Sequence, residues 1–117
     1  MRSPSAGPRE RPGLTGDTEP GAARLEVFVR GRVQGVGFRV HVAQAARQLG
    51  LVGWVANEAS GTVHCVAEGP RVDLERLLRE AREGPRGAVV DRVEHTFSAA
   101  TGTFARFEIR SGWHPGD

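Results

Sequence analysis

The sequence contains no lysine, so all 16 of its basic residues are arginines, set against 14 acidic residues and a formal net charge of only +2. Arginines that alternate with acids, as they do over residues 76–83, are typical of a solvated helix face. Nucleic-acid binding requires a one-sided basic stripe, and the sequence has none. We therefore expect no nucleic-acid partner.

The chain also has only one cysteine and no long apolar run. Cys65 cannot form an internal disulfide, which fits a reducing compartment such as the cytoplasm. Its place in an alternating apolar pattern predicts a small core residue rather than a nucleophile. No apolar segment reaches the roughly 20 residues that cross a bilayer. Residues 1–23 lack the apolar centre of a secretory signal. We expect a cytoplasmic protein without membrane association.

Composition divides the chain into three parts. Residues 1–22 are rich in proline, glycine, serine, threonine and charge, and we expect a disordered extension or a mis-assigned start there. Residues 23–112 carry the periodic apolar pattern of one folded domain, and residues 113–117 form a short polar tail. The size and composition suit a single modest core.

The apolar periodicity predicts five strands and two helices. We expect strands at 25–30, 51–57, 62–68, 89–97 and 104–110, and helices at 38–49 and 72–82. Gly50 is expected to cap the first helix, and Gly69-Pro70 to end the third strand. The order β-α-β-β-α-β with one appended strand predicts an α+β, ferredoxin-like fold. In this two-layer sandwich, an antiparallel sheet carries both helices on one face.

The most informative segment is residues 31–39, Gly-Arg-Val-Gln-Gly-Val-Gly-Phe-Arg. Three glycines directly before a helix allow tight turns that expose backbone N–H groups, and such groups form a nest for anions at a helix start. Arg39, in the first helical turn, would add a planar fork of donors suited to a phosphoryl group. The segment is neither a Walker loop nor G-x-G-x-x-G. Taken alone, it could equally be an ordinary strand-to-helix connection.

A second candidate is Asn57, which follows Gly53-Trp54-Val55-Ala56 at the end of a predicted strand. Asparagine at this place is commonly a turn former. Its amide can also accept from one group while it donates to another, which suits a residue that orients a water. The pattern alone leaves both interpretations open.

Taken together, these motifs resemble the acylphosphatase family. The resemblance rests on residues 31–39, 49–57, 61–63, 68–70 and 107–110, and it covers essentially all of residues 25–110. It implies an enzyme that hydrolyses acyl phosphates to a carboxylate and inorganic phosphate, without metal or cofactor. Its partners would be the small-molecule acyl phosphate and inorganic phosphate as product and inhibitor. We expect it to act as a monomer.

The resemblance also implies residue roles. Arg39 would hold the phosphate, and Asn57 would position the attacking water. The cradle would be made by the backbone amides of Val33, Gln34, Gly35, Val36, Gly37 and Phe38. One departure is Val40-His41, because many relatives carry an aromatic residue after the arginine. We expect altered packing there, with the chemistry retained.

Two other functions remain as alternatives. The fold also occurs in nucleic-acid-binding modules that stack bases on strand aromatics, but residues 62–66 contain no aromatic residue. The second alternative is a non-catalytic accessory domain that binds phosphate or acyl phosphate, as found at the start of larger carbamoyl-transfer maturation proteins. None of the histidines has neighbours at metal-ligand spacing, so we expect no metal site.

Overall fold

The structure is a computed structural model, and it describes residues 22–111. Of the expected extension at 1–22, only Ala22 is described, and it begins the first strand; the rest of the extension and the tail at 113–117 lie outside the described residues. The elements in chain order are β1 (Ala22–Arg32), α1 (Phe38–Gln48), β2 (Val52–Asn57), β3 (Val63–Pro70), α2 (Arg71–Glu83), β4 (Val89–Ala99) and β5 (Phe107–Arg110).

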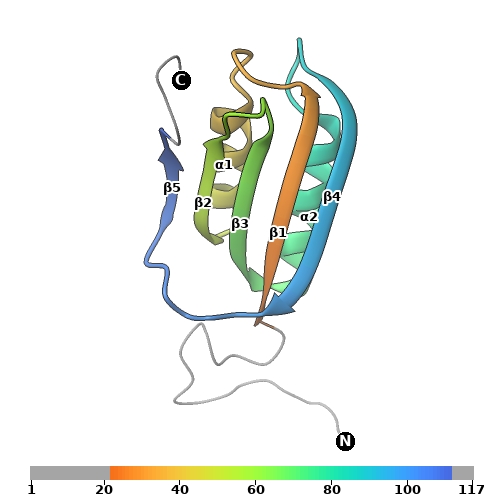
Figure 1. Ribbon diagram of the computed structural model, residues 1–117. Coiled ribbons are helices and arrows are strands. Elements are labelled where there is room, and N and C mark those ends of the chain that lie inside the picture. The colour runs from red at the N-terminus through yellow and green to blue at the C-terminus, as the bar shows by residue number, and fades with distance from the viewer. Residues whose placement is uncertain (1–21, 112–117) are drawn as a thin grey trace, which may run out of the picture.

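The strands form one sheet in the order β4-β1-β3-β2-β5 (Figure 1). The pairs β1–β3, β1–β4 and β2–β3 are antiparallel, as the sequence predicts. The expectation of a wholly antiparallel sheet is wrong for the last strand, because β5 runs parallel to β2, with Ala56 opposite Arg110. The connection from β4 passes along one end of the sheet and brings β5 up beside β2. The sheet is therefore mixed.

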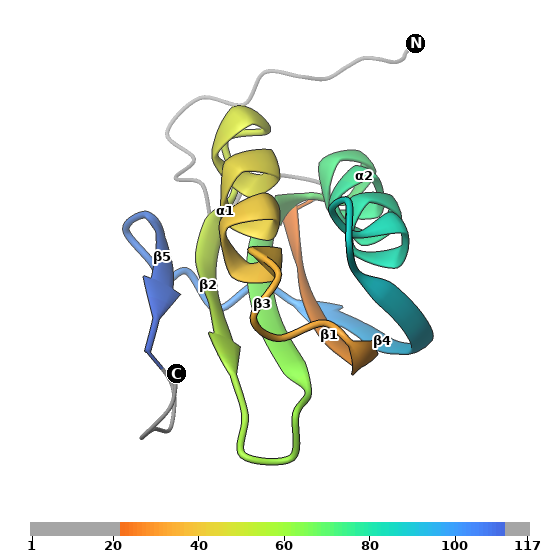
Figure 2. The same ribbon diagram turned by 90° about the horizontal axis from the view of Figure 1, so that it is seen from above.

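Both helices cover the same face of the sheet (Figure 2). Helix α1 packs over β2 and β5, and α2 packs over β1 and β3. The core lies between the layers, where alternate strand residues meet one apolar stripe from each helix. Its fully buried large side chains include Leu25, Val27, Val29, Phe38, Val42, Val55, Leu74 and Leu77. The predicted two-layer architecture is confirmed.

Several strand ends differ from the prediction, and two of them have a clear structural cause. Strand β3 continues through Gly69 and Pro70, because these residues pair with Ala23 and Ala22 of β1. Strand β5 begins at Phe107, three residues later than expected. The buried carboxylate of Glu68 accepts the N–H groups of Thr101 and Gly102 at 2.9 and 3.0 Å, which holds the preceding segment as a loop.

The predicted cap of α1 is confirmed. Gly50 has a left-handed φ of 73°, its N–H donates to the carbonyl of Arg47, and the N–H of Leu51 donates back to Ala46. This pairing satisfies carbonyls at the helix end, and a residue without a Cβ adopts the required conformation at the lowest cost. The cap turns the chain directly into β2, which carries Asn57.

Cys65 is a core residue, as predicted. Burial raises the pKa of its thiol to about 12, so the reactive thiolate is strongly disfavoured in the folded protein. Within residues 22–111, no helix combines the length and the apolar character needed to cross a membrane.

Candidate active site

The glycine segment forms a tight loop that leads into α1. Gly35 and Gly37 both have φ of 79°, and Gly37 is the N-cap of α1. No side chain from residues 22–111 caps this helix start, and its first turn contains no acidic residue. The N–H groups at the start of a helix have no acceptor within the helix, and the helix dipole adds partial positive charge there. The start of α1 is therefore built to face an anion.

Helix α2 provides the contrast. Its first turn carries Asp73, the residue type that the helix dipole favours at this place. The first turn of α1 carries Arg39 and no acid, whereas that of α2 carries Arg71 together with Asp73. An arginine at the positive end of a helix is electrostatically unfavourable unless an anion lies nearby. The start of α1 thus differs from that of α2 in lacking an acidic residue.

The side chain of Gln34, a residue of the loop, anchors the loop to a neighbouring turn. Its side-chain Nε2 donates to the carbonyls of Glu58 and Thr62 at 2.9 and 3.1 Å. Both acceptors belong to the turn between β2 and β3, immediately after Asn57. Gln34 therefore fixes the position of the loop relative to the end of β2. The sequence pattern gave no indication of this side-chain role.

The loop, α1 and β2 meet around a small hollow of about 120 Å³. Its lining residues are Val33, Gly35, Gly37, Phe38, Arg39, Val40, Asn57 and Ile109. Six of the eight residues named from the sequence are among them, whereas Gln34 and Val36 are not. Asn57 is only 7% exposed, and it lies on the helix-covered face of β2 with Val55. Arg39 and Asn57, 18 positions apart in sequence, thus border one cavity.

Strand β5 completes the hollow, which the motifs do not indicate. Ile109 lines it, and the carbonyl of Arg110 accepts a hydrogen bond of 2.8 Å from Nη1 of Arg39. A second arginine of α1, Arg47, donates through Nε and Nη2 to the carbonyl of Phe107 at 3.1 and 2.9 Å. Helix α1 therefore holds β5 at both ends of the strand. The parallel pairing with β2 decides this placement, and no local signal in residues 107–110 predicts it.

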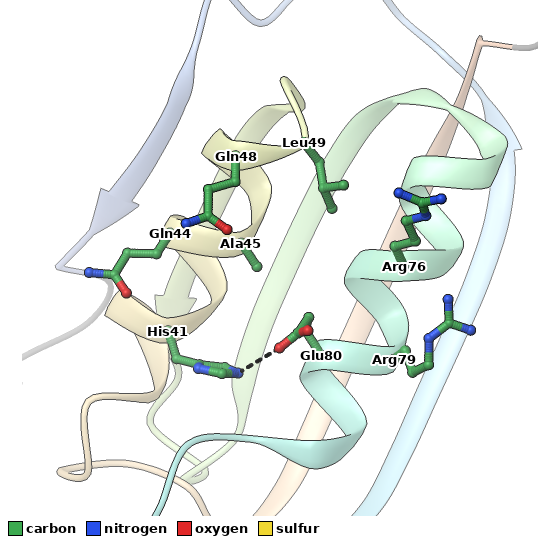
Figure 3. A pocket seen from close by; sticks show the side chains of 8 residues that line it. All are labelled: His41, Gln44, Ala45, Gln48, Leu49, Arg76, Arg79 and Glu80. Carbon is green, nitrogen blue, oxygen red and sulfur yellow. Dashed lines mark ion pairs between the residues drawn. The ribbon is translucent and has the colours of Figure 1, made fainter.

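A larger groove of about 430 Å³ lies between the two helices (Figure 3). His41 of α1 points toward Glu80 of α2 there, with 3.3 Å between Nε2 and Oε1. The groove has mixed charge, with Arg76 and Arg79 on the α2 side and Ala45 and Leu49 on the α1 side. It contains neither the glycine loop nor Arg39 or Asn57. In the part of the chain that the structure describes, no three His, Cys, Asp or Glu side chains are grouped to hold a metal ion.

The open face of the sheet is the surface that a nucleic-acid-binding module of this fold would use. Phe28 of β1 stacks on His64 of β3, with ring centroids 4.1 Å apart, and Trp54 of β2 lies edge-on to the same histidine at 4.8 Å. The arginines of this face are largely matched by acids, through the pairs Arg24–Glu68, Arg30–Glu94, Arg92–Glu94 and Arg106–Glu108. The face therefore has aromatic rings but no one-sided positive charge.

The comparison with known families agrees with this geometry. The family model described as acylphosphatase matches residues 25–109. The chain belongs to the acylphosphatase family. The match spans β1 to β5 and includes the glycine loop, Arg39 and Asn57.

Individual acylphosphatases match over most of their length. The acylphosphatase of Koribacter versatilis is 49% identical over 86 residues, which are 74% of this chain and 78% of that protein. The crystal structure of acylphosphatase from Bacillus subtilis superposes with a TM-score of 0.73 at 35% identity, covering 75% of this chain and 98% of that one.

Full-length HypF, in its phosphate- and nucleotide-bound form, matches with a TM-score of 0.71 at 30% identity, and the match covers 12% of that chain.

Proposed function

We propose that this protein is an acylphosphatase, which hydrolyses acyl phosphates to a carboxylate and inorganic phosphate. The observation that carries the proposal is the convergence of Arg39, Asn57 and the start of α1, which no side chain of residues 22–111 caps, on one hollow of about 120 Å³. These are a cation, a neutral amide and a set of backbone donors. Membership of the family supports the same reaction.

In the proposed reaction, the oxygen of a water forms a bond to phosphorus while the bond between phosphorus and the acyl oxygen breaks. The electron pair of the broken bond leaves with the carboxylate. An acyl phosphate dianion and one water give one carboxylate and one dihydrogen phosphate, so atoms and charge balance. Because the leaving group is a stable anion, the site needs no strong base. Positioning and charge stabilisation suffice.

Arg39 and the backbone N–H groups of the loop and helix start would bind the phosphoryl oxygens. Arginine suits this role because its planar fork binds two oxygens and keeps its charge at every working pH. Asn57 would hold the attacking water through its side-chain amide, which can donate and accept at once. The groups come from the glycine loop, α1 and β2, and the contacts of Gln34 and β5 hold these elements together.

We further propose that the enzyme acts as a monomer in the cytoplasm. The candidate site is supported by one chain, since loop, helix and both strands around the hollow belong to the same fold. The single cysteine is buried, as suits a reducing compartment. Residues 23–112 would be the functional unit. Light scattering during gel filtration tests the monomer, and a fragment of residues 23–112 with unchanged kcat/KM would support the proposed unit.

The decisive experiment is turnover of benzoyl phosphate by the purified chain in the presence of EDTA. Release of one phosphate per substrate consumed, with competitive inhibition by inorganic phosphate, is the expected result. Phosphate binding without turnover would overturn the catalytic proposal and favour the accessory-domain alternative. Turnover that EDTA abolishes would contradict a mechanism that uses only the groups named above.

A further inference from the structure

The size of the hollow limits which part of a substrate it can enclose. Pockets that bury whole drug-sized ligands are about 300–1,000 Å³, whereas this one is about 120 Å³. It has room for a phosphoryl group and a water, and the acyl group of the substrate must extend beyond it. The acyl group therefore contacts whatever side chains stand at the opening.

The positions of the proposed groups define the direction in which the acyl group leaves. In-line displacement puts the attacking water and the leaving oxygen on opposite sides of phosphorus. Asn57 is 7% exposed and marks the buried side of the hollow. A water held there attacks from within, so the bond to the acyl oxygen points to the solvent side. This step rests on the proposed function.

Two apolar side chains border the hollow on that solvent side. Val40 is 49% exposed and Ile109 is 39% exposed, and both line the hollow. Among residues 22–111, only four large hydrophobic side chains are exposed, and Val40 and Ile109 are two of the four. They lie 69 positions apart in sequence, on α1 and β5, and both line the same hollow.

We infer that Val40 and Ile109 form the acyl-group subsite and give the enzyme a preference for acyl phosphates with an apolar acyl group. An apolar acyl group that covers these side chains removes apolar surface from water, which is favourable in proportion to the area buried. A methyl group as small as that of acetyl phosphate covers little of them. The subsite thus raises kcat/KM for bulky apolar substrates over small ones, while binding of inorganic phosphate does not involve it.

The test compares benzoyl phosphate with acetyl phosphate in the variants Val40→Thr and Ile109→Thr. Threonine keeps the branching at Cβ, so the fold is little disturbed. Its hydroxyl replaces one methyl group of Val40 and the ethyl branch of Ile109. One methylene enclosed in an apolar pocket changes kcat/KM by about 10–200-fold. Because Val40 and Ile109 are partly exposed, we expect each variant to lower kcat/KM for benzoyl phosphate by less, roughly 3- to 10-fold. For acetyl phosphate we expect less than about a twofold change, with the phosphate inhibition constant unchanged.

The matched control is Val72→Thr. Val72 is 58% exposed, but it lies on α2, away from the hollow. The Val72→Thr variant should have an unchanged kcat/KM for both benzoyl phosphate and acetyl phosphate. The inference would be overturned if kcat/KM fell equally for the two substrates, or if the ratio of the two kcat/KM values stayed unchanged in both subsite variants. Turnover by the wild-type protein would still support the proposed function in either case. A wild-type protein that hydrolyses neither substrate would overturn both. Circular dichroism confirms that each variant is folded, and Val40→Ala provides a second test of the same wall.

Discussion

The guanidinium of Arg39 donates through Nη1 to the backbone carbonyl of Arg110, at 2.8 Å. This contact joins the first turn of α1 to the last residue of β5. On the other side of the sheet, the guanidinium of Arg110 lies 4.7 Å from the centre of the Trp54 ring, which ties the same residue to β2. The proposed phosphate-binding arginine is therefore oriented by the end of the last strand.

We predict that Arg39→Ala lowers kcat by about 10³- to 10⁵-fold, the range known for an arginine that contacts a transferring phosphoryl group. The variant should also bind inorganic phosphate more weakly, because the same guanidinium holds the product. Steady-state kinetics with phosphate as competitive inhibitor measures both effects. Arg39→Lys is the matched variant, since it keeps the charge but loses the fork. Full activity in Arg39→Lys would contradict binding through the fork.

We predict that Asn57→Ala lowers kcat by about 10²- to 10³-fold, as the loss of one preorganised group commonly does. Its phosphate inhibition constant should stay close to the wild-type value, because the attacking water is not part of product binding. The same inhibition assay used for Arg39→Ala gives the comparison. If both variants lost phosphate affinity equally, the proposed division of roles would be wrong. Because Asn57 is buried, the unfolding free energy of the variant must be measured alongside.

Gly37→Ala should lower the free energy of unfolding by roughly 1–2 kcal/mol, the cost of a left-handed conformation for a residue with a Cβ. Gly37 has φ of 79°, and an added Cβ would meet no atom within 4 Å, so the cost is conformational and not steric. Gly37→Asn should lose less, because asparagine adopts this conformation more readily. Urea denaturation of the two variants measures the difference. Equal losses would show that the backbone conformation is not the cause.

Glu68→Gln should destabilise the protein at neutral pH by about 2 kcal/mol, within the range for hydrogen bonds to a charged group. Burial raises the pKa of Glu68, but donation from Thr101, Gly102 and Arg24 outweighs it and holds the pKa below its ordinary value. A carboxylate with a lowered pKa contributes stability above the unfolded pKa and loses it as pH falls through the folded pKa. Thermal unfolding from pH 7 downward should show the gap between wild type and variant shrinking in acid. A gap independent of pH would refute this.

Local sequence was sufficient for the elements whose signals lie within a few residues. The helix start after Gly37, the cap at Gly50 and the burial of Cys65 follow from backbone preference and apolar periodicity, which act over short distances. The motifs also named Arg39 and Asn57 as separate candidates, and the structure places both beside one cavity. Only the family resemblance, and no spacing argument, joined these two residues before the structure did.

The sequence by itself determined the order of the elements, the two-layer architecture and the glycine loop before α1. The tertiary structure decided that β5 pairs in parallel with β2 and that Gln34 braces the loop against the turn after Asn57. It also decided that Ile109 and Val40 line the same hollow. Each of these contacts joins segments more than 20 positions apart, whose approach depends on how the whole sheet assembles. Periodicity describes which face of an element is apolar, but it carries no information about which distant element will cover that face.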